Sequence, residues 1–296
     1  MLGFARDLAR QAGERLMGAY GRLASGQIDH KGRRDLVTAA DRETEAFLAA
    51  EIERAFPDDA ILGEESIRRP GRSGHVWILD PVDGTTNFVH QHPFFCISLA
   101  RASGYSGPPN GPDGLAPHET GYFRSGELPQ VDLGVIYAPV LGELFTAERG
   151  RGAELNERPI RVSETGDLGQ SLMATGFAYR RNELAVNNLE NFARLALEVR
   201  GIRRCGAAAL DLCYVAAGRF EAFWELYLKP WDVAAGMLVV EEAGGRVTGI
   251  APDRHPLEGV EVVASNGRVH EEVRRQLVGP DPAWVASERE VLFGRR

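Results

Sequence analysis

The chain has 296 residues, of which 44% are hydrophobic and 26% are charged, and its formal net charge is −8. This composition is typical of a globular protein of one large domain or two closely packed subdomains, and so acidic a chain is not expected to bind a nucleic-acid backbone. No apolar run reaches the roughly 18 residues that a transmembrane helix needs, and the amphipathic N-terminus is unlike a signal peptide. We therefore expect a cytoplasmic protein without a membrane partner.

Helices are predicted at the start of the chain. Apolar residues recur at helical spacing over 2–23, and the segment 38–57 begins with a Thr38–Asp41 capping pattern and ends at Pro57. Strands are predicted where apolar runs are bounded by turn residues, at 75–79, 94–100, 131–139, 142–149 and 158–163.

The second half of the chain alternates between helix and strand. The predicted helices are 183–200, 207–218, 231–245 and 269–278, and the predicted strands are 220–225 and 261–266. This order mixes meanders with crossovers, which favours layered sheets and helices over a TIM barrel.

Two segments differ in composition from the rest. Residues 103–130 are dense in glycine, proline and serine, which predicts a mostly irregular insertion that packs on the surface or on a dimer partner through a few apolar residues. A C-terminal tail is predicted over 279–296, so the folded unit, with two packed subdomains, is expected over 1–278. The three cysteines, Cys96, Cys205 and Cys213, have no CxxC spacing, which predicts reduced core thiols rather than a redox or zinc site.

The segment WILDPVDGTTNF, residues 77–88, places Asp80 and Asp83 where a buried strand ends. Pro81 favours an extended conformation at Asp80, and Gly84 lets the backbone approach a ligand closely. The two threonines that follow can cap a helical turn, whose N-terminal amides favour a phosphate. Carboxylates for a hard cation beside amides for an anion indicate a metal-bridged phosphate, although a β-turn is the alternative for this fragment taken alone.

Further acids follow apolar stretches elsewhere in the chain. Glu64 and Glu65 are adjacent in LGEES, and Asp232 follows a tryptophan at a predicted helix start. Asp35 and Asp41 lie just before and at the start of the second predicted helix. Each acid alone has a structural explanation, a solvated loop or a helix cap, but their joint occurrence indicates a site. Oxygen ligands without histidine or cysteine favour Mg²⁺ or Mn²⁺ over zinc.

The blocks GEES, WILDPVDGTTNF and PWDVAAG, in this order and spacing, resemble the inositol monophosphatase family of Mg²⁺-dependent, lithium-sensitive phosphatases. The resemblance extends from about residue 5 to residue 278 and includes DLVTAAD, ATGF and EEAGG. It implies an α/β layered fold, an α-β-α-β-α sandwich with mixed and antiparallel sheets between helix layers. It also implies a homodimer, more than one Mg²⁺ ion in each site, and a small phosphorylated metabolite as substrate.

The resemblance also assigns roles to individual residues. The implied metal ligands are Glu64, Asp80, the carbonyl of Val82, Asp83 and Asp232. Asp41 and Thr85 are implied to orient and activate the attacking water, with Glu65 in a supporting catalytic position beside Glu64. The implied substrate contacts are the amides of Gly84 and Thr85 for phosphate, and Gly206, Ala207, Ala208 and Glu225 for the hydroxyl groups. Lys31 and Asp35 match positions near a mobile metal loop.

Some features of the sequence do not enter this assignment. The family has a short turn where this chain inserts 103–130. His90 and His92 are spaced as HxH beside the motif, but the oxygen-rich site favours a packing or surface role for them. Arginine pairs begin at positions 33, 68, 180, 203, 274 and 295, and their scatter favours a solvated surface over a binding patch.

The predicted function is that of a Mg²⁺-dependent phosphomonoesterase acting on a small sugar or cyclitol phosphate, with inositol 1-phosphate as the favoured substrate. Fructose-1,6-bisphosphatase, histidinol phosphatase and nucleotide 3'-phosphatase activities stay open, because the same metal core serves them. A non-catalytic scaffold that binds protein or RNA is the alternative from another class. The complete set of acids and the lack of a dominant basic patch disfavour that alternative.

Overall fold

The computed structural model describes residues 1–23, 26, 28–30, 36–107, 123, 128–251, 255–258 and 261–278. The helices of this part of the chain are α1 (Leu2–Ala19), α2 (Ala39–Ala55), α3 (Thr85–Val89), α4 (Leu189–Glu198), α5 (Ala208–Ala216), α6 (Pro230–Glu242) and α7 (His270–Val278). No helix within these ranges has both the length and the apolar character needed to cross a membrane.

The strands form two large sheets and one hairpin. The larger sheet has the order β10-β9-β8-β7-β6-β5-β3-β4 and consists of β3 (Ala60–Gly63), β4 (Arg68–Arg69), β5 (His75–Asp83), β6 (Cys96–Ser103), β7 (Gln130–Ala138), β8 (Glu143–Glu148), β9 (Ala153–Leu155) and β10 (Arg158–Pro159). The smaller sheet has the order β12-β11-β13-β15-β14 and consists of β11 (Leu172–Thr175), β12 (Gly201–Arg203), β13 (Ala222–Leu226), β14 (Arg246–Thr248) and β15 (Glu261–Ser265). The hairpin pairs β1 (Ile28–His30) with β2 (Leu36–Thr38).

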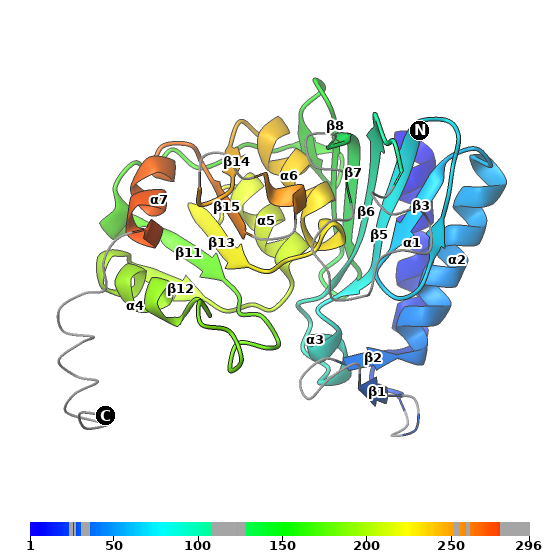
Figure 1. Ribbon diagram of the computed structural model, residues 1–296, viewed down its shortest axis with the longest axis horizontal. Helices are drawn as coiled ribbons and strands as arrows, with labels where there is room; N and C mark the ends of the chain where they lie inside the picture. The colour runs from blue at the N-terminus through cyan, green and yellow to red at the C-terminus, as the bar shows by residue number, and fades with distance from the viewer. Residues whose placement is uncertain are drawn as a thin grey trace.

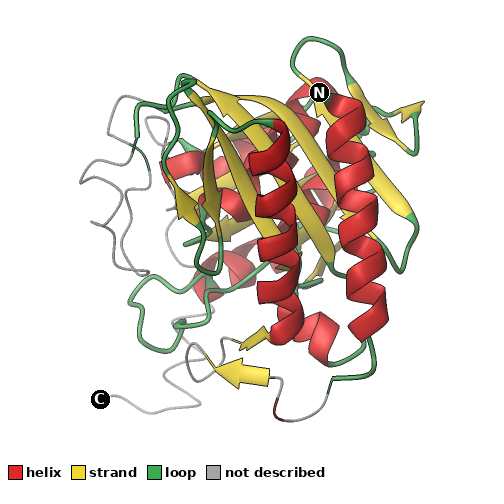
Figure 2. Cartoon of the chain, turned by 90° about the vertical axis from the view of Figure 1, so that its right-hand side faces the viewer, coloured by secondary structure: helices red, strands yellow, loops and turns green. Residues whose placement is uncertain are grey.

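Layers of helix and sheet alternate across the molecule. In Figure 1 they follow one another from right to left as α1 with α2, the larger sheet, α5 with α6, the smaller sheet, and α4 with α7. Figure 2 shows α1 and α2 lying next to each other across the outer face of the larger sheet. Both sheets are mixed, because each contains parallel and antiparallel pairs. The predicted α-β-α-β-α sandwich is therefore confirmed.

The apolar residues gather in clusters that correspond to the contacts between these layers. One cluster lies between the larger sheet and α1 with α2, a second surrounds α5 and α6 between the sheets, and a third lies beneath α4 and α7. Strand β5 contributes to two of them, since Trp77 and Leu79 belong to the first cluster and Val76 and Ile78 to the second. This alternation explains why HVWIL is apolar on both faces of the strand.

Several element boundaries differ from the prediction. The first helix ends at Ala19 instead of 23. The strand predicted over 158–163 is only Arg158–Pro159, because the chain then leaves the sheet and the Val162 amide bonds to the Ala243 carbonyl at 3.2 Å. The helix predicted over 183–200 begins only at Leu189, since Asn188 has a φ of 73° and a buried side chain that bonds to Thr175 and to Gly176.

The base of the predicted insertion is partly described. Phe123 is buried and packs edge-to-face against Tyr105, with ring centroids 6.1 Å apart. The Tyr105 amide bonds to the Gly74 carbonyl at 3.0 Å, which fixes the first residues after β6 to the turn before β5. The rest of the predicted insertion, and the predicted tail over 279–296, lie outside the described residues. All three cysteines are free, with Cys96 and Cys213 buried and Cys205 half-buried.

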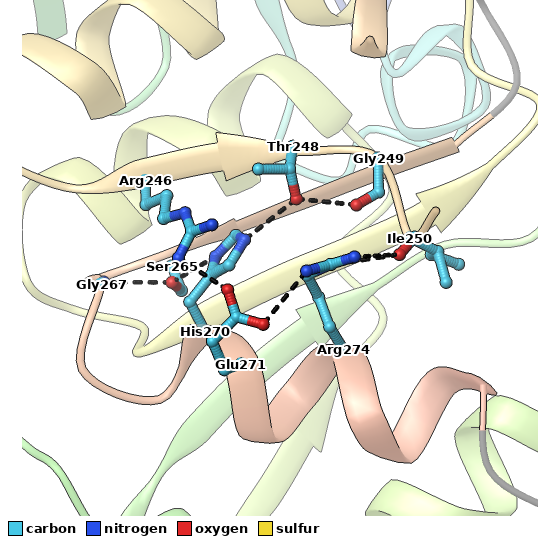
Figure 3. Close-up of polar contacts among 9 residues, drawn as sticks. All are labelled: Arg246, Thr248, Gly249, Ile250, Ser265, Gly267, His270, Glu271 and Arg274. Carbon is cyan, nitrogen blue, oxygen red and sulfur yellow. Dashed lines mark hydrogen bonds and ion pairs between the residues drawn. The ribbon is translucent and has the colours of Figure 1, made fainter. Parts of the chain in front are cut away.

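A buried histidine joins the smaller sheet to α7, as Figure 3 shows. Each ring nitrogen of His270 lies 2.9 Å from a hydroxyl oxygen, Nε2 from Thr248 and Nδ1 from Ser265. Thr248 donates its own hydrogen to the Gly249 carbonyl at 2.7 Å. His270 must then donate from Nε2, and Nδ1 accepts from Ser265, so the ring is satisfied only while it is neutral.

Charged neighbours reinforce this neutral state. Burial and the guanidinium of Arg246 lower the pKa of His270 to about 4, against the opposing charge of Glu271, and Arg274 lowers it further. Arg246 and Arg274 both form ion pairs with Glu271, at 2.7 and 3.0 Å. Protonation of His270 would therefore add a charge beside two arginines.

The acid sensitivity of the fold should depend on His270. The pKa of His270 is about 4 in the folded protein and about 6.5 in the unfolded chain, so the unfolded chain takes up the proton first. The stability that the neutral ring contributes above pH 6.5 is therefore lost as the pH falls towards 4. We expect the free energy of unfolding in urea to fall by about 2 kcal/mol over this window through His270, and His270→Gln to remove most of that slope. His92→Gln, on an exposed turn, is the control and should keep it. If the free energy of unfolding of His270→Gln falls with pH as steeply as that of the parent, the acid sensitivity belongs to other groups.

Candidate metal and phosphate site

The parallel pairing of β3 with β5 brings two of the acidic motifs together. Gly63 is in register with Leu79, and the Glu64 amide donates to the Leu79 carbonyl at 3.1 Å. Glu64 therefore lies beside Asp80, just beyond the last pair of the ladder. Side chains at the carboxyl ends of parallel strands meet at one edge of the sheet, where ligands commonly bind.

Beyond Leu79 the strand continues through the second aspartate. β5 extends to Asp83, and its register against β6 shifts between Asp80 and Asp83. Pro81, which lacks an amide hydrogen, lies inside this irregularity, as expected for proline in a strand. The Val82 amide donates to Asp80 Oδ1 at 2.9 Å and fixes that carboxylate. Residues 81–83 of the PVDG β-turn considered from the sequence therefore lie in strand β5, and the chain turns at Gly84, whose φ is +96°.

The N-terminus of α5 holds the second aspartate. The Ala209 amide donates to Asp83 Oδ2 at 2.7 Å, and the Ala208 amide also bonds to this carboxylate. A carboxylate at this position is favoured by the helix dipole. A Cβ on Gly84 would lie 3.2 Å from the Gly206 carbonyl oxygen, so the turn after β5 and the loop before α5 are in close contact. The predicted phosphate-binding and hydroxyl-binding segments therefore adjoin each other.

Asp232 is positioned by the start of α6. Its Oδ2 accepts the Lys229 amide at 2.6 Å, while Pro230 occupies the first turn, where a missing amide hydrogen has no cost. The helix start is tied to the larger sheet, because Ser98 donates its hydroxyl to the Trp231 carbonyl at 3.2 Å. Ser98 is the register partner of Asp80 in β6, so this bond places Asp232 on the same side of the sheet edge.

Asp41 caps α2 and also contacts α3. Its Oδ2 accepts the Thr38 amide at 3.0 Å and the Thr38 hydroxyl, which confirms the predicted capping pattern. Its Oδ1 lies 3.0 Å from the hydroxyl of Thr85, and that hydroxyl is also 3.1 Å from the Val82 carbonyl. The hydroxyl has one hydrogen for these two acceptors, and both are part of the predicted site.

Glu45 was not predicted, and it organises the loop that carries Glu64 and Glu65. Its buried carboxylate accepts the backbone amides of Glu65, Ser66 and Ile67 at 2.8, 3.0 and 3.2 Å. A Cβ on Gly63 would collide with Glu45 Oε1, so only glycine allows this approach. The sequence contained one sign of this role: Glu45 lies one helical turn after Asp41, on the same face of α2 as the buried Leu48.

The charges of the clustered acids strongly oppose one another. Burial raises the pKa of Asp80 well above its ordinary value, and the carboxylates of Glu64, Asp83 and Asp232 raise it further. Burial also raises the pKa of Asp83 to about 7, even though the α5 amides favour its ionised form. These acids cannot all ionise without a source of positive charge.

Glu225 extends the group of acids from the smaller sheet. Burial raises the pKa of its carboxyl to about 8; Arg204 lowers it, and Asp232 and Asp83 raise it. Its carboxylate fits only because residue 176 is glycine, where a Cβ would collide with both oxygens.

Asp211 is a further buried acid nearby, which the sequence interpretation passed over. It lies on α5, and its Oδ1 has no hydrogen-bond partner. As the single charged residue of AAALDLCYVAAG, it was visible in the sequence as an acid inside an apolar helix.

The chemistry of this set fits a hard divalent cation. Within the described ranges, no three acid, histidine or cysteine side chains already surround one point as in a closed metal cage. Yet the buried Asp80 lies within electrostatic reach of Glu64, Asp83 and Asp232, and each of the three aspartates has an oxygen fixed by a backbone amide. Carboxylate oxygens are the ligands that Mg²⁺ takes in proteins, so the cluster matches its donor preference.

The residues singled out in the sequence therefore lie in one region. Glu65 and Asp41 share a neighbour, since both lie within electrostatic reach of Arg42, which pairs with Asp29 of the hairpin at 2.7 Å. His90 and His92 are exposed, in agreement with the surface role predicted for them. Lys31 and Asp35 lie outside the described residues.

Comparison with known proteins identifies the family. The model of the inositol monophosphatase family matches residues 1–106 and 129–279. The chain belongs to the inositol monophosphatase family. The gap in the match falls within the predicted insertion, so that segment is an addition to the family's common sequence.

Relatives of this inositol monophosphatase family member carry two kinds of name. The inositol-1-monophosphatase of Synechocystis sp. is 40% identical over 96% of this chain and 90% of its own. The Nus factor SuhB of Pseudomonas aeruginosa is 41% identical over 90% of this chain and 91% of its own.

Solved structures of the family also match closely. An inositol monophosphatase from Anabaena (Nostoc) sp. matches with a TM-score of 0.78 at 37% identity, covering 96% of this chain and 97% of its own. The extragenic suppressor protein suhB from Bartonella henselae matches with a TM-score of 0.80 at 38% identity, covering 93% of this chain and 97% of its own. The layered fold is thus shared across both kinds of name.

Glu45→Gln should loosen the loop that carries Glu64. The glutamine amide group would face backbone N–H groups in place of a carboxylate oxygen, so at least one buried donor loses its acceptor. We expect the free energy of unfolding in urea to fall by about 1–3 kcal/mol, and calorimetric titration to show weaker Mg²⁺ binding. Glu43→Gln, on the exposed face of the same helix, is the matched control and should change neither quantity. Equal Mg²⁺ affinity in Glu45→Gln and the parent would show that Glu45 has no role in positioning this loop.

Proposed function

We propose that this chain is a Mg²⁺-dependent phosphomonoesterase that hydrolyses a small sugar or cyclitol phosphate, with inositol 1-phosphate as its substrate. The observation that carries the proposal is the convergence of four acids, one just after β3, two in β5 and one in α6, at one sheet edge beside the Asp41–Thr85 pair. The relatives named inositol-1-monophosphatase support the choice of substrate.

The acidic cluster is the proposed metal site. Glu64, Asp80, Asp83, Asp232 and the Val82 carbonyl would hold Mg²⁺, with Mn²⁺ as a possible substitute of the same donor preference. When bound, Mg²⁺ supplies positive charge to the phosphate and lowers the pKa of a water molecule. The backbone amides on the aspartates keep their carboxylates in place before any ligand arrives.

Asp41 and Thr85 are the proposed pair that orients the attacking water. When the Thr85 hydroxyl donates to Asp41 Oδ1, its oxygen keeps lone pairs that can accept a water hydrogen. Asp41 cannot easily turn away, because its other oxygen is held by Thr38 in the capping box. Glu65 is proposed to support this arrangement through the charge network of Arg42.

The phosphate and the rest of the substrate are proposed to lie between the two sheets' edges. The amides of Gly84 and Thr85 would hold phosphate oxygens, and Gly206, Ala207, Ala208 and Glu225 would contact hydroxyl groups. In-line displacement by water depends on positioning and charge neutralisation, so the chain needs no covalent nucleophile. Lithium inhibition, a homodimer and a cytoplasmic location are part of the same proposal, on the strength of family membership.

A second candidate function follows from the relatives named Nus factor SuhB. We propose that this chain could act as a Nus factor in addition to its catalysis, and not in place of it. Every acid of the proposed metal site is present in this chain. A protein that only binds a partner does not need four clustered carboxylates, and their mutual repulsion destabilises the fold.

The test is a phosphatase screen of inositol 1-phosphate, fructose 1,6-bisphosphate, histidinol phosphate and nucleotide 3'-phosphates, with Mg²⁺ or with excess EDTA. We expect the highest kcat/KM with inositol 1-phosphate, no turnover in EDTA, and inhibition by lithium. Turnover that persists in EDTA would refute the metal mechanism, and a clean preference for another ester would replace the proposed substrate.

Asp83→Asn should separate catalysis from stability. Turnover with Mg²⁺ is expected to fall by at least about 10³-fold, because a metal ligand loses its charge. In EDTA the free energy of unfolding should be equal to or higher than that of the parent, since the neutral side chain relieves repulsion from Glu64 and the cost of burying a charge. Mg²⁺ should raise the Tm of the parent but not of the variant. A variant that retains turnover with Mg²⁺ would show that the Asp83 carboxylate is not needed to bind the metal.

A further inference from the structure

One asparagine lies where three segments of the proposed site meet. Asn87 lies on α3, just after the turn at Gly84. Its side-chain nitrogen donates to the carbonyls of Phe94 and Cys205 at 2.6 and 2.9 Å. A Cβ on Gly206 would lie 3.2 Å from the same nitrogen, so the loop before α5 packs directly on this side chain. Asn87 therefore connects the turn that is proposed to bind phosphate with the loop that is proposed to contact hydroxyl groups.

The two bonds of Asn87 require a side-chain amide. An NH₂ group has two hydrogens and can donate to two carbonyls at once, whereas a hydroxyl has one hydrogen and a carboxylate has none. The side chain is half-buried, where a carbonyl without a donor costs more than on an open surface. Removal of the amide would therefore leave two carbonyls short of a donor, one in the segment before β6 and one in the loop before α5.

The phosphate turn has anchors besides Asn87. The Thr85 hydroxyl lies 3.0 Å from Asp41 Oδ1, and this contact ties the start of α3 to α2. Phe88 is buried in the apolar cluster between the larger sheet and the outer helices. These contacts do not involve the Asn87 amide, so the turn should keep its place when that amide is removed.

The loop before α5 is held at its ends and by its own helix. Strand β12 pairs with β11 before the loop, and the Ala209 amide bonds to Asp83 after it at 2.7 Å. The Cys205 thiol bonds to Asp211 of α5. Asn87 ties the backbone of Cys205 to the phosphate turn. Loss of the Asn87 amide should therefore displace this loop more than the turn.

We propose that Asn87 is a positioning residue that sets the distance between the two binding segments, so that the site holds an ester by its phosphate and by its hydroxyl groups at once. The inference rests on the proposed phosphatase function, because the roles of Gly84 and of Gly206, Ala207 and Ala208 are part of that proposal. Small displacements of binding groups have large effects on rate, since the reacting atoms must be aligned in the bound ester. Asn87 thus makes the site selective for esters whose body carries hydroxyl groups.

The test compares inositol 1-phosphate with phenyl phosphate, an ester without hydroxyl groups. Asn87→Leu keeps the size of the side chain and removes both donors. We expect it to lower kcat/KM for inositol 1-phosphate by about tenfold or more, mainly through KM, and to change that for phenyl phosphate by less than about twofold. Asn87→Ala should give the same selective loss, and urea unfolding checks that both variants are folded.

Asn156→Ala is the matched control. Its amide also donates to a carbonyl, that of Gly142 at 2.9 Å, but it lies between β9 and β10, at the opposite edge of the larger sheet from β3. This variant should lower the Tm without changing kcat/KM for either ester.

Binding provides a second measurement, independent of turnover. In an Asp41→Asn background with Mg²⁺, adding Asn87→Leu should lower the calorimetric affinity for inositol 1-phosphate about tenfold and leave that for inorganic phosphate unchanged. Equal losses on both esters would mean that Asn87 serves the phosphate turn or the fold, and would overturn the inference. Unchanged affinity and unchanged kcat/KM would overturn it too. A parent whose binding of inositol 1-phosphate depends on Asn87, but which hydrolyses neither ester, would refute the proposed function alone.

Discussion

The mutual repulsion of buried carboxylates is the constraint on which the proposed site depends. Burial raises the cost of ionising Asp80 and Asp83, and the half-buried Glu64 and Asp232 add negative charge beside Asp80. A chain optimised for stability alone would not place them together. The fold tolerates the arrangement because backbone amides from three different elements compensate part of the charge, and a bound cation would compensate the rest.

This compensation explains why the layered architecture matters to the chemistry. The amide that bonds to Asp83 comes from α5, between the sheets, whereas the amide that fixes Asp80 comes from its own strand. The loop of Glu64 is held from the opposite layer, by Glu45 on α2. Because these elements pack through separate apolar clusters, no single layer can shift without moving one acid relative to the others.

Local signals in the sequence predicted much of this, and long-range pairing explains the rest. The Thr38–Asp41 cap, the apolar strand before Asp80 and the helix after Trp231 depend on neighbours in the chain, and they form as expected. The parallel partner of β5 is a four-residue strand, too short to recognise without its tertiary contacts. Helix α4 began later than predicted because Asn188 is held by residues of β11 and β13, which periodicity cannot show. The role of Glu45 depends on a loop 20 residues away.

The acids fall into two groups according to whether backbone amides or a side-chain cation stabilise their carboxylates. Asp80, Asp83 and Asp232 are fixed by backbone amides, which suits ligands that must present oxygens in one arrangement. Glu225 is balanced by a side-chain cation, Arg204, at the end of a flexible stem. Backbone amides favour one geometry, whereas a guanidinium on a long side chain can follow ligands of different size. The proposed metal-binding part of the site is thus held by backbone amides, whereas the proposed substrate-binding part is balanced by a long side chain.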